Sequence, residues 1–115
     1  MDLTLTESES PPFHVVEVSG EIDVYTAPAL REKLTALVDA GHVDLVVNLT
    51  EVRFMDSTGL GLLVGVLKRV RGLDGRLQLV IDSERLLKVF RITALTQVFT
   101  IRETVDEALA ADREG

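Results

Sequence analysis

The feature that most constrains the fold is an almost continuous apolar run at residues 43–49, followed by a helical pattern at residues 57–71. A strand that is apolar on both sides is typical of a parallel sheet covered on both faces. Parallel strands are joined by a crossover, which is usually a helix. This pair of segments therefore predicts a strand-helix unit at the centre of an α/β fold.

The flanking segments extend the same pattern in both directions. Alternating residues at 3–6, Pro11-Pro12 and a second strand at 13–18 predict an opening hairpin. A helix is expected from Thr26 and Pro28 to a stop at Gly41. Further strands are expected at 76–81 and 98–101, with helices at 83–90 and around 105–109. We expect an α/β fold with a mostly parallel central sheet, one antiparallel edge strand from the N-terminal hairpin, and helices after the strands.

Length and charge limit the partners. A chain of 115 residues with 46% apolar residues and no long linker predicts a single domain over residues 1–115. The net charge of −7 opposes nucleic acid and anionic membranes, so we expect protein partners. The absence of cysteine excludes disulfides and thiolate metal sites. The opening residues do not resemble a signal peptide, and no apolar stretch is long enough to span a bilayer, which predicts a cytoplasmic protein.

The segment most informative about function is residues 54–61, between the central strand and its helix. In open α/β folds the carboxyl edge of the sheet usually carries the working surface, and a helix that follows a strand begins there. Ser57, in the first turn, is therefore expected to be reachable. The alternative is that Asp56 or Ser57 is only the helix N-cap, accepting a hydrogen bond from a first-turn amide.

The helix from Ser57 has two apolar sides. One stripe, which we expect to cover the sheet, contains Leu60, Leu63, Val64, Leu67 and Val70. The opposite face contains Thr58, Gly61, Leu62, Gly65, Val66, Lys68 and Arg69. Each exposed mid-helix glycine costs about 0.5 to 1 kcal/mol relative to alanine, which indicates a compensating use such as close approach by a partner helix. The alternative is that a neighbouring segment of the same chain covers this face.

The residues fit a serine hydrolase or a receiver domain less well. A serine hydrolase would place glycine where Met55 stands, and only His14 and His42 are available as bases. A receiver domain with Asp56 as phosphate acceptor would need an acidic pair near the end of the first strand to bind magnesium. The sequence lacks such a pair there. We therefore expect no enzyme, no metal site and no cofactor.

A resemblance adds to this interpretation. The segment Asp56-Ser-Thr-Gly after a strand, together with Gly20-Glu-Ile-Asp-Val and Thr26-Ala-Pro, resembles the bacterial anti-sigma factor antagonists of the STAS-domain superfamily. The resemblance covers nearly the whole chain and is closest to actinobacterial members. It implies a partner-switching cycle in which the unmodified protein binds and sequesters an anti-sigma factor and so releases a sigma factor.

The resemblance also implies roles for individual residues. The serine that matches Ser57 is phosphorylated by the anti-sigma factor, a serine kinase of the histidine-kinase-like ATPase fold, and a PP2C-type phosphatase removes the phosphate. ATP and magnesium belong to the kinase. Asp23 is expected beside this edge, where it would set the approach of the kinase, or else it is a turn aspartate bonded to its own backbone. Thr58 is a weaker candidate for modification, although it could touch the partner. The alternative function is a constitutive scaffold or sensor module of the same fold without a phosphorylation cycle.

Overall fold

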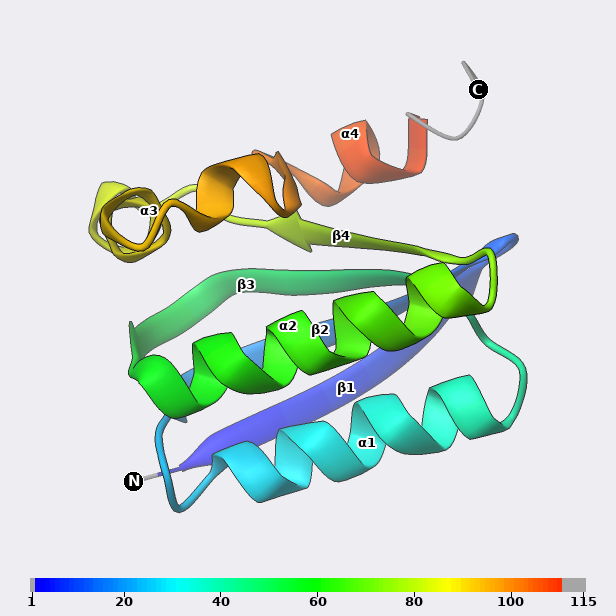
Figure 1. Ribbon diagram of the computed structural model, residues 1–115, viewed down its shortest axis with the longest axis horizontal. Coiled ribbons are helices and arrows are strands. Elements are labelled where there is room, and N and C mark those ends of the chain that lie inside the picture. Colours follow the sequence, from blue (N-terminus) through cyan, green and yellow to red (C-terminus); the bar gives the residue numbers. More distant parts are fainter. Residues whose placement is uncertain (1, 111–115) are drawn as a thin grey trace.

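The computed structural model describes residues 2–110, which form one five-stranded sheet with helices packed against it (Figure 1). The strands are β1 (Leu3–Ser10), β2 (Phe13–Ile22), β3 (Asp44–Met55), β4 (Arg76–Val80) and β5 (Thr100–Arg102). The helices are α1 (Ala27–Asp39), α2 (Ser57–Gly72), α3 (Glu84–Ile92) and α4 (Val105–Ala110), with a 3-10 turn at Leu95–Gln97.

The order of the strands follows the sequence, β1-β2-β3-β4-β5. β1 pairs antiparallel with β2, and every other neighbouring pair is parallel. The turn is tight because the two prolines leave Ser10 directly opposite Phe13. The expected fold class, a mostly parallel sheet with an antiparallel edge strand from an N-terminal hairpin, is confirmed.

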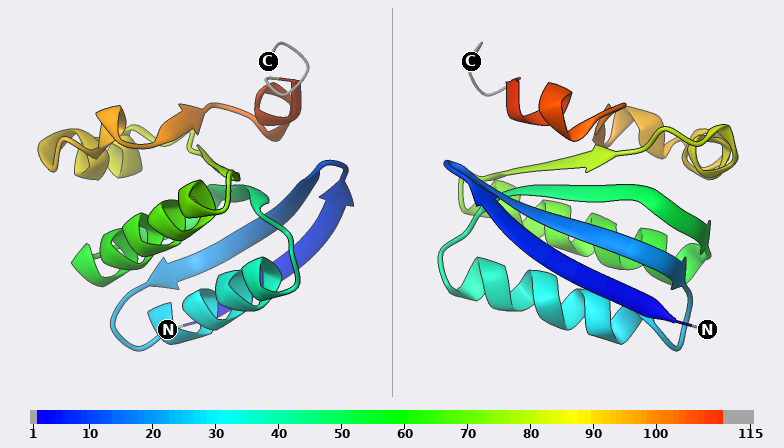
Figure 2. Two further views of the ribbon diagram at one scale, coloured as in Figure 1. Left: turned by 45° about the vertical axis from the view of Figure 1, so that its right-hand side comes forward. Right: turned by 180° about the vertical axis from the view of Figure 1, so that it is seen from behind.

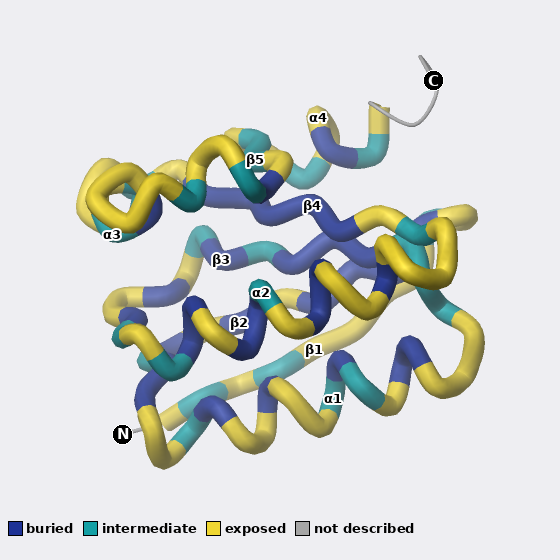
Figure 3. Tube along the Cα trace, in the orientation of Figure 1, coloured by how far each residue is buried: buried dark blue, intermediate teal, exposed yellow. Residues whose placement is uncertain are grey.

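The helices cover the two faces of the sheet unequally. α1 and α2 lie side by side over one face, whereas α4 covers only one end of the other (Figures 1 and 2). β2 shows the consequence, since its first four residues are buried but Glu17 and Ser19 further along are exposed. Both long helices are buried on the side toward the sheet and exposed on the side away from it (Figure 3).

Two neighbouring strand ends define the carboxyl edge of the sheet. In the parallel register of β2 and β3, Ile22 is the partner of Met55. The backbone amide of Asp56 continues this pairing by donating to the Ile22 carbonyl oxygen at 3.1 Å. The loop after β2 and the start of α2 therefore lie next to each other, although about 30 residues of chain separate them.

Candidate functional site

Ser57 is the first residue of α2, and Asp56 is the residue that caps the helix. Asp56 Oδ1 accepts hydrogen bonds from the amides of Thr58 at 2.9 Å and Gly59 at 3.4 Å. Ser57 is exposed, and its hydroxyl makes no hydrogen bond with any residue in the described range 2–110. Of the two N-cap candidates, Asp56 therefore holds the helix start, and the Ser57 hydroxyl is left for other chemistry.

The lack of a side chain at Gly59 allows the start of α2 to pack closely against the ends of β2 and β3. A Cβ atom built at Gly59 would lie 2.7 Å from Ile22 Cγ2 and 2.7 Å from Met55 Cγ. No side chain larger than hydrogen fits this gap without movement of its neighbours. The first turn is thus fixed on the sheet, and the position of Ser57 is fixed with it.

Asp23 occupies the loop beside this first turn, but its carboxylate points into the loop. Only 6% of the residue is exposed, and Oδ1 accepts from the amides of Thr26 at 3.0 Å and Tyr25 at 2.9 Å. These bonds, first the one from the Thr26 amide, hold the pKa of Asp23 below its ordinary value. The turn interpretation of Asp23 is therefore confirmed, and its carboxylate lies inside the loop rather than on the open surface.

Exposed apolar side chains lie at the carboxyl edge of the sheet, and their exposure was not predicted from the sequence. Val24 and Tyr25 in the loop after β2 are 58% and 81% exposed, and Phe54 at the end of β3 is 51% exposed. Phe54 also lines a pocket of about 250 Å³ between the end of β3 and α3. Exposed aromatic residues are typical anchors of protein interfaces. The available signal was the apolar pair Val24-Tyr25 in the short segment before the helix expected from Thr26.

The outer face of α2 is only partly open. Leu62 and Val66, on the face opposite the sheet-covering stripe, are only 4% and 7% exposed, so they are covered within the chain itself. α1 packs against this side of α2, as the alternative of a neighbouring segment proposed. Gly61 and Gly65 remain exposed, and apart from the nearby backbone of α2 itself, no atom of the described residues would lie within 4 Å of a Cβ atom at either position.

A groove therefore runs between α1 and α2. It has a volume of about 290 Å³ and is lined by Arg31, Thr35, Gly61, Leu62, Gly65, Val66 and Arg69. Its floor is apolar and basic side chains stand at its margins. Ser57, Gly61 and Gly65 follow each other at intervals of four residues, so they lie along one side of the helix. Thr58 lies beside this line and is half-buried.

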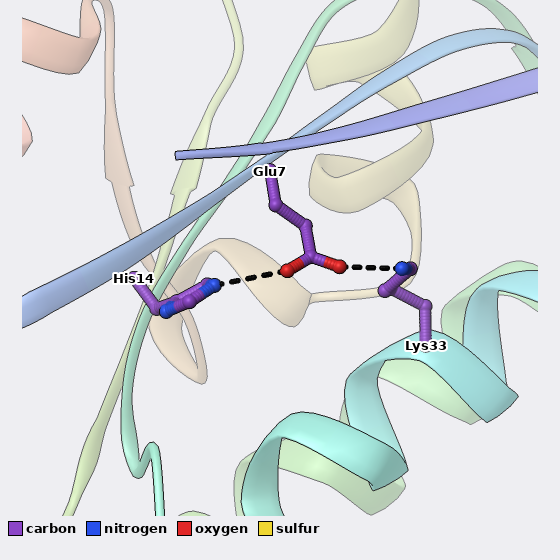
Figure 4. Close-up of polar contacts among 3 residues, drawn as sticks. All are labelled: Glu7, His14 and Lys33. Carbon is purple, nitrogen blue, oxygen red and sulfur yellow. Dashed lines mark hydrogen bonds and ion pairs between the residues drawn. The ribbon is translucent and has the colours of Figure 1, made fainter. Parts of the chain in front are cut away.

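The two histidines lie at the other end of the sheet. His14 is near the start of β2, where its Nε2 lies 3.2 Å from Glu7 Oε1, and Glu7 also pairs with Lys33 of α1 (Figure 4). The bonds from Lys33 and then His14 lower the pKa of Glu7. The His42 ring lies 4.6 Å from the His14 ring, and the 12-residue strand β3 separates His42 from Ser57. Neither histidine can therefore act as a base for Ser57.

Residues 2–110 contain no group of three or more His, Asp or Glu side chains placed to hold a metal ion. Within the same range, no helix combines the length and apolar character needed to cross a bilayer.

Known proteins share this sequence and fold. Residues 5–108 match the STAS domain family. The anti-sigma-B factor antagonist of Staphylococcus aureus (strain NCTC 8325 / PS 47) is 42% identical over 103 residues, which cover 90% of this chain and 95% of that protein. The crystal structure of an anti-sigma factor antagonist from Mycobacterium paratuberculosis has a TM-score of 0.90 at 32% identity, covering 97% of this chain and 95% of its own.

A third relative is known in a modified state. The Bacillus cell fate determinant SpoIIAA in its phosphorylated form has a TM-score of 0.72 at 26% identity, covering 99% of this chain and 100% of its own. With a family match over most of its length, the chain belongs to the STAS-domain family, in which it is similar to the anti-sigma factor antagonists.

Proposed function

We propose that this protein is an anti-sigma factor antagonist that works by partner switching in the cytoplasm. Its unphosphorylated form binds and sequesters an anti-sigma factor, a serine kinase of the histidine-kinase-like ATPase fold, and thereby releases a sigma factor. Phosphorylation of Ser57 by that kinase abolishes binding, and a PP2C-type phosphatase restores it. The similarity to anti-sigma factor antagonists, one relative of which is known in a phosphorylated form, supports the proposal.

The observation that carries the proposal is the division of roles between Asp56 and Ser57. Because Asp56 accepts the first-turn amide bonds, modification of the exposed Ser57 hydroxyl removes no contact that holds the fold. A phosphate adds about −1.5 to −2 charges and three acceptor oxygens. A helix N-terminus receives an anion favourably through its free amides and its dipole. The folded chain can therefore carry the phosphate without rearrangement.

The surroundings of Ser57 explain why the same phosphate would release a partner. The exposed side chains of Val24, Tyr25 and Phe54 offer apolar contact area around the edge where Ser57 lies. A partner seated there would have to desolvate the added charge, and Asp56 adds like-charge repulsion. Changing a complex from nearly full to nearly empty needs about 5.5 kcal/mol of differential affinity, which a buried uncompensated dianion can supply.

We assign the groove between α1 and α2 to the same partner. Gly61 and Gly65 let a partner backbone approach α2 closely, while Leu62 and Val66 form the apolar floor beneath it. Thr58 would contact the partner beside Ser57. Asp23 acts through the loop, because its hydrogen bonds hold the backbone that presents Val24 and Tyr25.

Affinity capture with a matched set of baits tests the proposal. Wild type, Ser57→Ala and Ser57→Glu are exposed to a lysate of cells that express the protein, and retained proteins are identified by mass spectrometry. Thr96→Glu, which makes the same kind of change at an exposed position far from α2 in sequence, serves as the control. The eluted complexes are then incubated with ATP and Mg²⁺, and the phosphorylated residue is mapped.

We expect wild type, Ser57→Ala and Thr96→Glu to retain a histidine-kinase-like ATPase, and Ser57→Glu to lose it. The phosphate should map to Ser57 in wild type and be absent from Ser57→Ala. If all four baits retain the same proteins, the protein is a constitutive scaffold and the hypothesis of a phosphorylation switch is wrong. A phosphate on Thr58 would contradict the assignment of the site.

A further inference from the structure

A second polar pocket lies at the far end of α2 from Ser57. It has a volume of about 260 Å³, and its polar lining comes from Arg71, Arg76, Gln78, Thr100 and Arg102. Of the residues in the described range 2–110 that line it, none is acidic, although the whole chain carries a net charge of −7. Arg71 lies 14 residues beyond Ser57 on the helix, which corresponds to about 21 Å at 1.5 Å per residue. The pocket is therefore distinct from the proposed partner surface.

Gln78 is the buried polar residue that organises this pocket. It is only 5% exposed and stands in β4 among apolar residues. Its Nε2 donates to the Ala108 carbonyl oxygen at 2.9 Å, and its Oε1 accepts from Arg102 Nε at 3.1 Å. A buried amide is costly unless both of its ends are hydrogen-bonded, and here one of those bonds orients the Arg102 guanidinium. The two terminal nitrogens of Arg102 make no hydrogen bond with residues 2–110.

Arg71 approaches the pocket from a different element. Its Nη2 donates to the Val98 carbonyl oxygen at 3.1 Å, which ties the last turns of α2 to the segment before β5. Its other guanidinium nitrogens make no hydrogen bond within residues 2–110 and can act as donors. Thr100, at the start of β5, adds an exposed hydroxyl. Two guanidinium groups and a hydroxyl from separate elements thus line one cavity.

Among the described residues that line the pocket, the charged side chains are arginines, and two contributions oppose their charge. Arg76 Nε donates to Asp44 Oδ1 at 3.1 Å, so this guanidinium is largely balanced. The C-terminal end of α2 carries a partial charge of about −0.5. The two formal positive charges of Arg71 and Arg102 exceed that partial charge, and they are the groups available to an anion.

We propose that this pocket binds the phosphate or diphosphate group of a small molecule through Arg71, Thr100 and Arg102. A guanidinium binds two oxygens of an oxyanion side by side. Two such groups from separate elements suit a tetrahedral phosphate, which presents oxygens in several directions, better than a planar carboxylate. The site does not depend on the phosphorylation of Ser57.

Nuclear magnetic resonance of the nitrogen-15-labelled full chain tests the proposal. The chain is titrated with inorganic phosphate, pyrophosphate and acetate, with sodium chloride used to keep the ionic strength constant. We expect phosphate and pyrophosphate to cause saturable shifts of the Thr100 amide, the Gln78 side-chain amide and the Arg102 Nε signal, and acetate to cause none. The absence of saturable shifts with either phosphate probe, or equal binding of acetate, overturns the proposal.

Three variants locate the site. Arg71→Gln and Arg102→Gln should each weaken pyrophosphate binding by at least about tenfold, the effect of losing a charge-assisted pair. Arg91→Gln is the control, because Arg91 pairs with Glu84 on α3, away from the pocket. The affinity of this variant for pyrophosphate should equal that of wild type. Loss of Arg102 removes a hydrogen bond to Gln78 and could disturb the pocket. Arg71 makes no such bond to Gln78, so Arg71→Gln tests the site independently. Unchanged affinity in Arg71→Gln would refute the assignment.

Discussion

At the scale of single residues, Gly59 and Asp23 hold the two neighbouring loops in place. Gly59 has no room for a Cβ atom between Ile22 and Met55, whereas the carboxylate of Asp23 closes the turn that leads into α1. Neither residue exposes a functional group of its own. Both act by fixing what stands beside them, Ser57 in one case and Tyr25 in the other.

Gly59→Ala should therefore destabilise the protein by about 1 to 3 kcal/mol, the usual cost of overpacking a close contact. It should also weaken binding of the anti-sigma factor, because the start of α2 has to move away from the sheet. Urea unfolding followed by circular dichroism measures the first effect. Gly61→Ala is the matched control, since its Cβ position has no atom of residues 2–110 within 4 Å other than the nearby backbone of α2. Equal stability of the two variants would contradict this account.

The stability of the turn should depend on pH through Asp23. Because the pKa of Asp23 is lowered in the fold, its contribution is complete above the ordinary value of 3.8 and is lost as the pH falls through the lower folded-state value. Asp23→Asn keeps an acceptor oxygen but removes the charge. We expect this variant to be less stable than wild type near neutral pH and equal to it in strong acid. A stability difference that is independent of pH would show that the charge is not involved.

At the scale of elements, α2 shows what sequence periodicity can predict about a helix and what it cannot. The prediction of a helix from Ser57 after a buried strand is confirmed, because the strand pattern, the cap and the apolar repeat are all local signals. The sequence left open what covers Leu62 and Val66, because the covering helix α1 lies some 30 residues earlier in the chain. Periodicity identifies the apolar sides of a helix, but it does not say which element covers each side.

The same limit explains the rest of the site. β3 continues to Met55 instead of stopping at residue 49, because its last residues pair only with β2 and do not need apolar side chains on both faces. The exposed positions of Val24, Tyr25 and Phe54 depend on which strand ends meet at the edge of the sheet. The position of Ser57 and Asp56 at the start of α2 could be predicted from the sequence, whereas the apolar surface around them could not.

The two glycines of α2 provide a prediction at this scale. Gly61→Ala and Gly65→Ala should each stabilise the isolated protein by about 0.5 to 1 kcal/mol, because alanine favours the helix and meets no neighbour. Gly65→Leu should fill the groove between α1 and α2 and weaken the complex with the anti-sigma factor. Thermal unfolding and titration calorimetry measure the two effects. Destabilisation by both alanines would mean that the glycines serve the fold itself.

At the scale of the whole molecule, the negative charge of Ser57→Glu should change binding but not folding. We expect Ser57→Ala and Ser57→Glu to unfold within about 0.5 kcal/mol of wild type, as surface substitutions usually do. Asp56→Ala should cost about 0.5 to 2 kcal/mol, because it removes the helix cap. Urea unfolding and size-exclusion chromatography of the three variants test this. Large destabilisation by either Ser57 variant would place Ser57 among the residues that hold the fold.

The separation between the capping carboxylate and the exposed hydroxyl has a consequence for the life of the protein in the cell. Under the proposed function, one molecule can be modified and restored many times without unfolding, so the enzymes that add and remove phosphate set the pace of each round. The response then requires neither new synthesis nor degradation of the antagonist. A constant stock of one small protein would carry the signal in the fraction of its molecules that are modified.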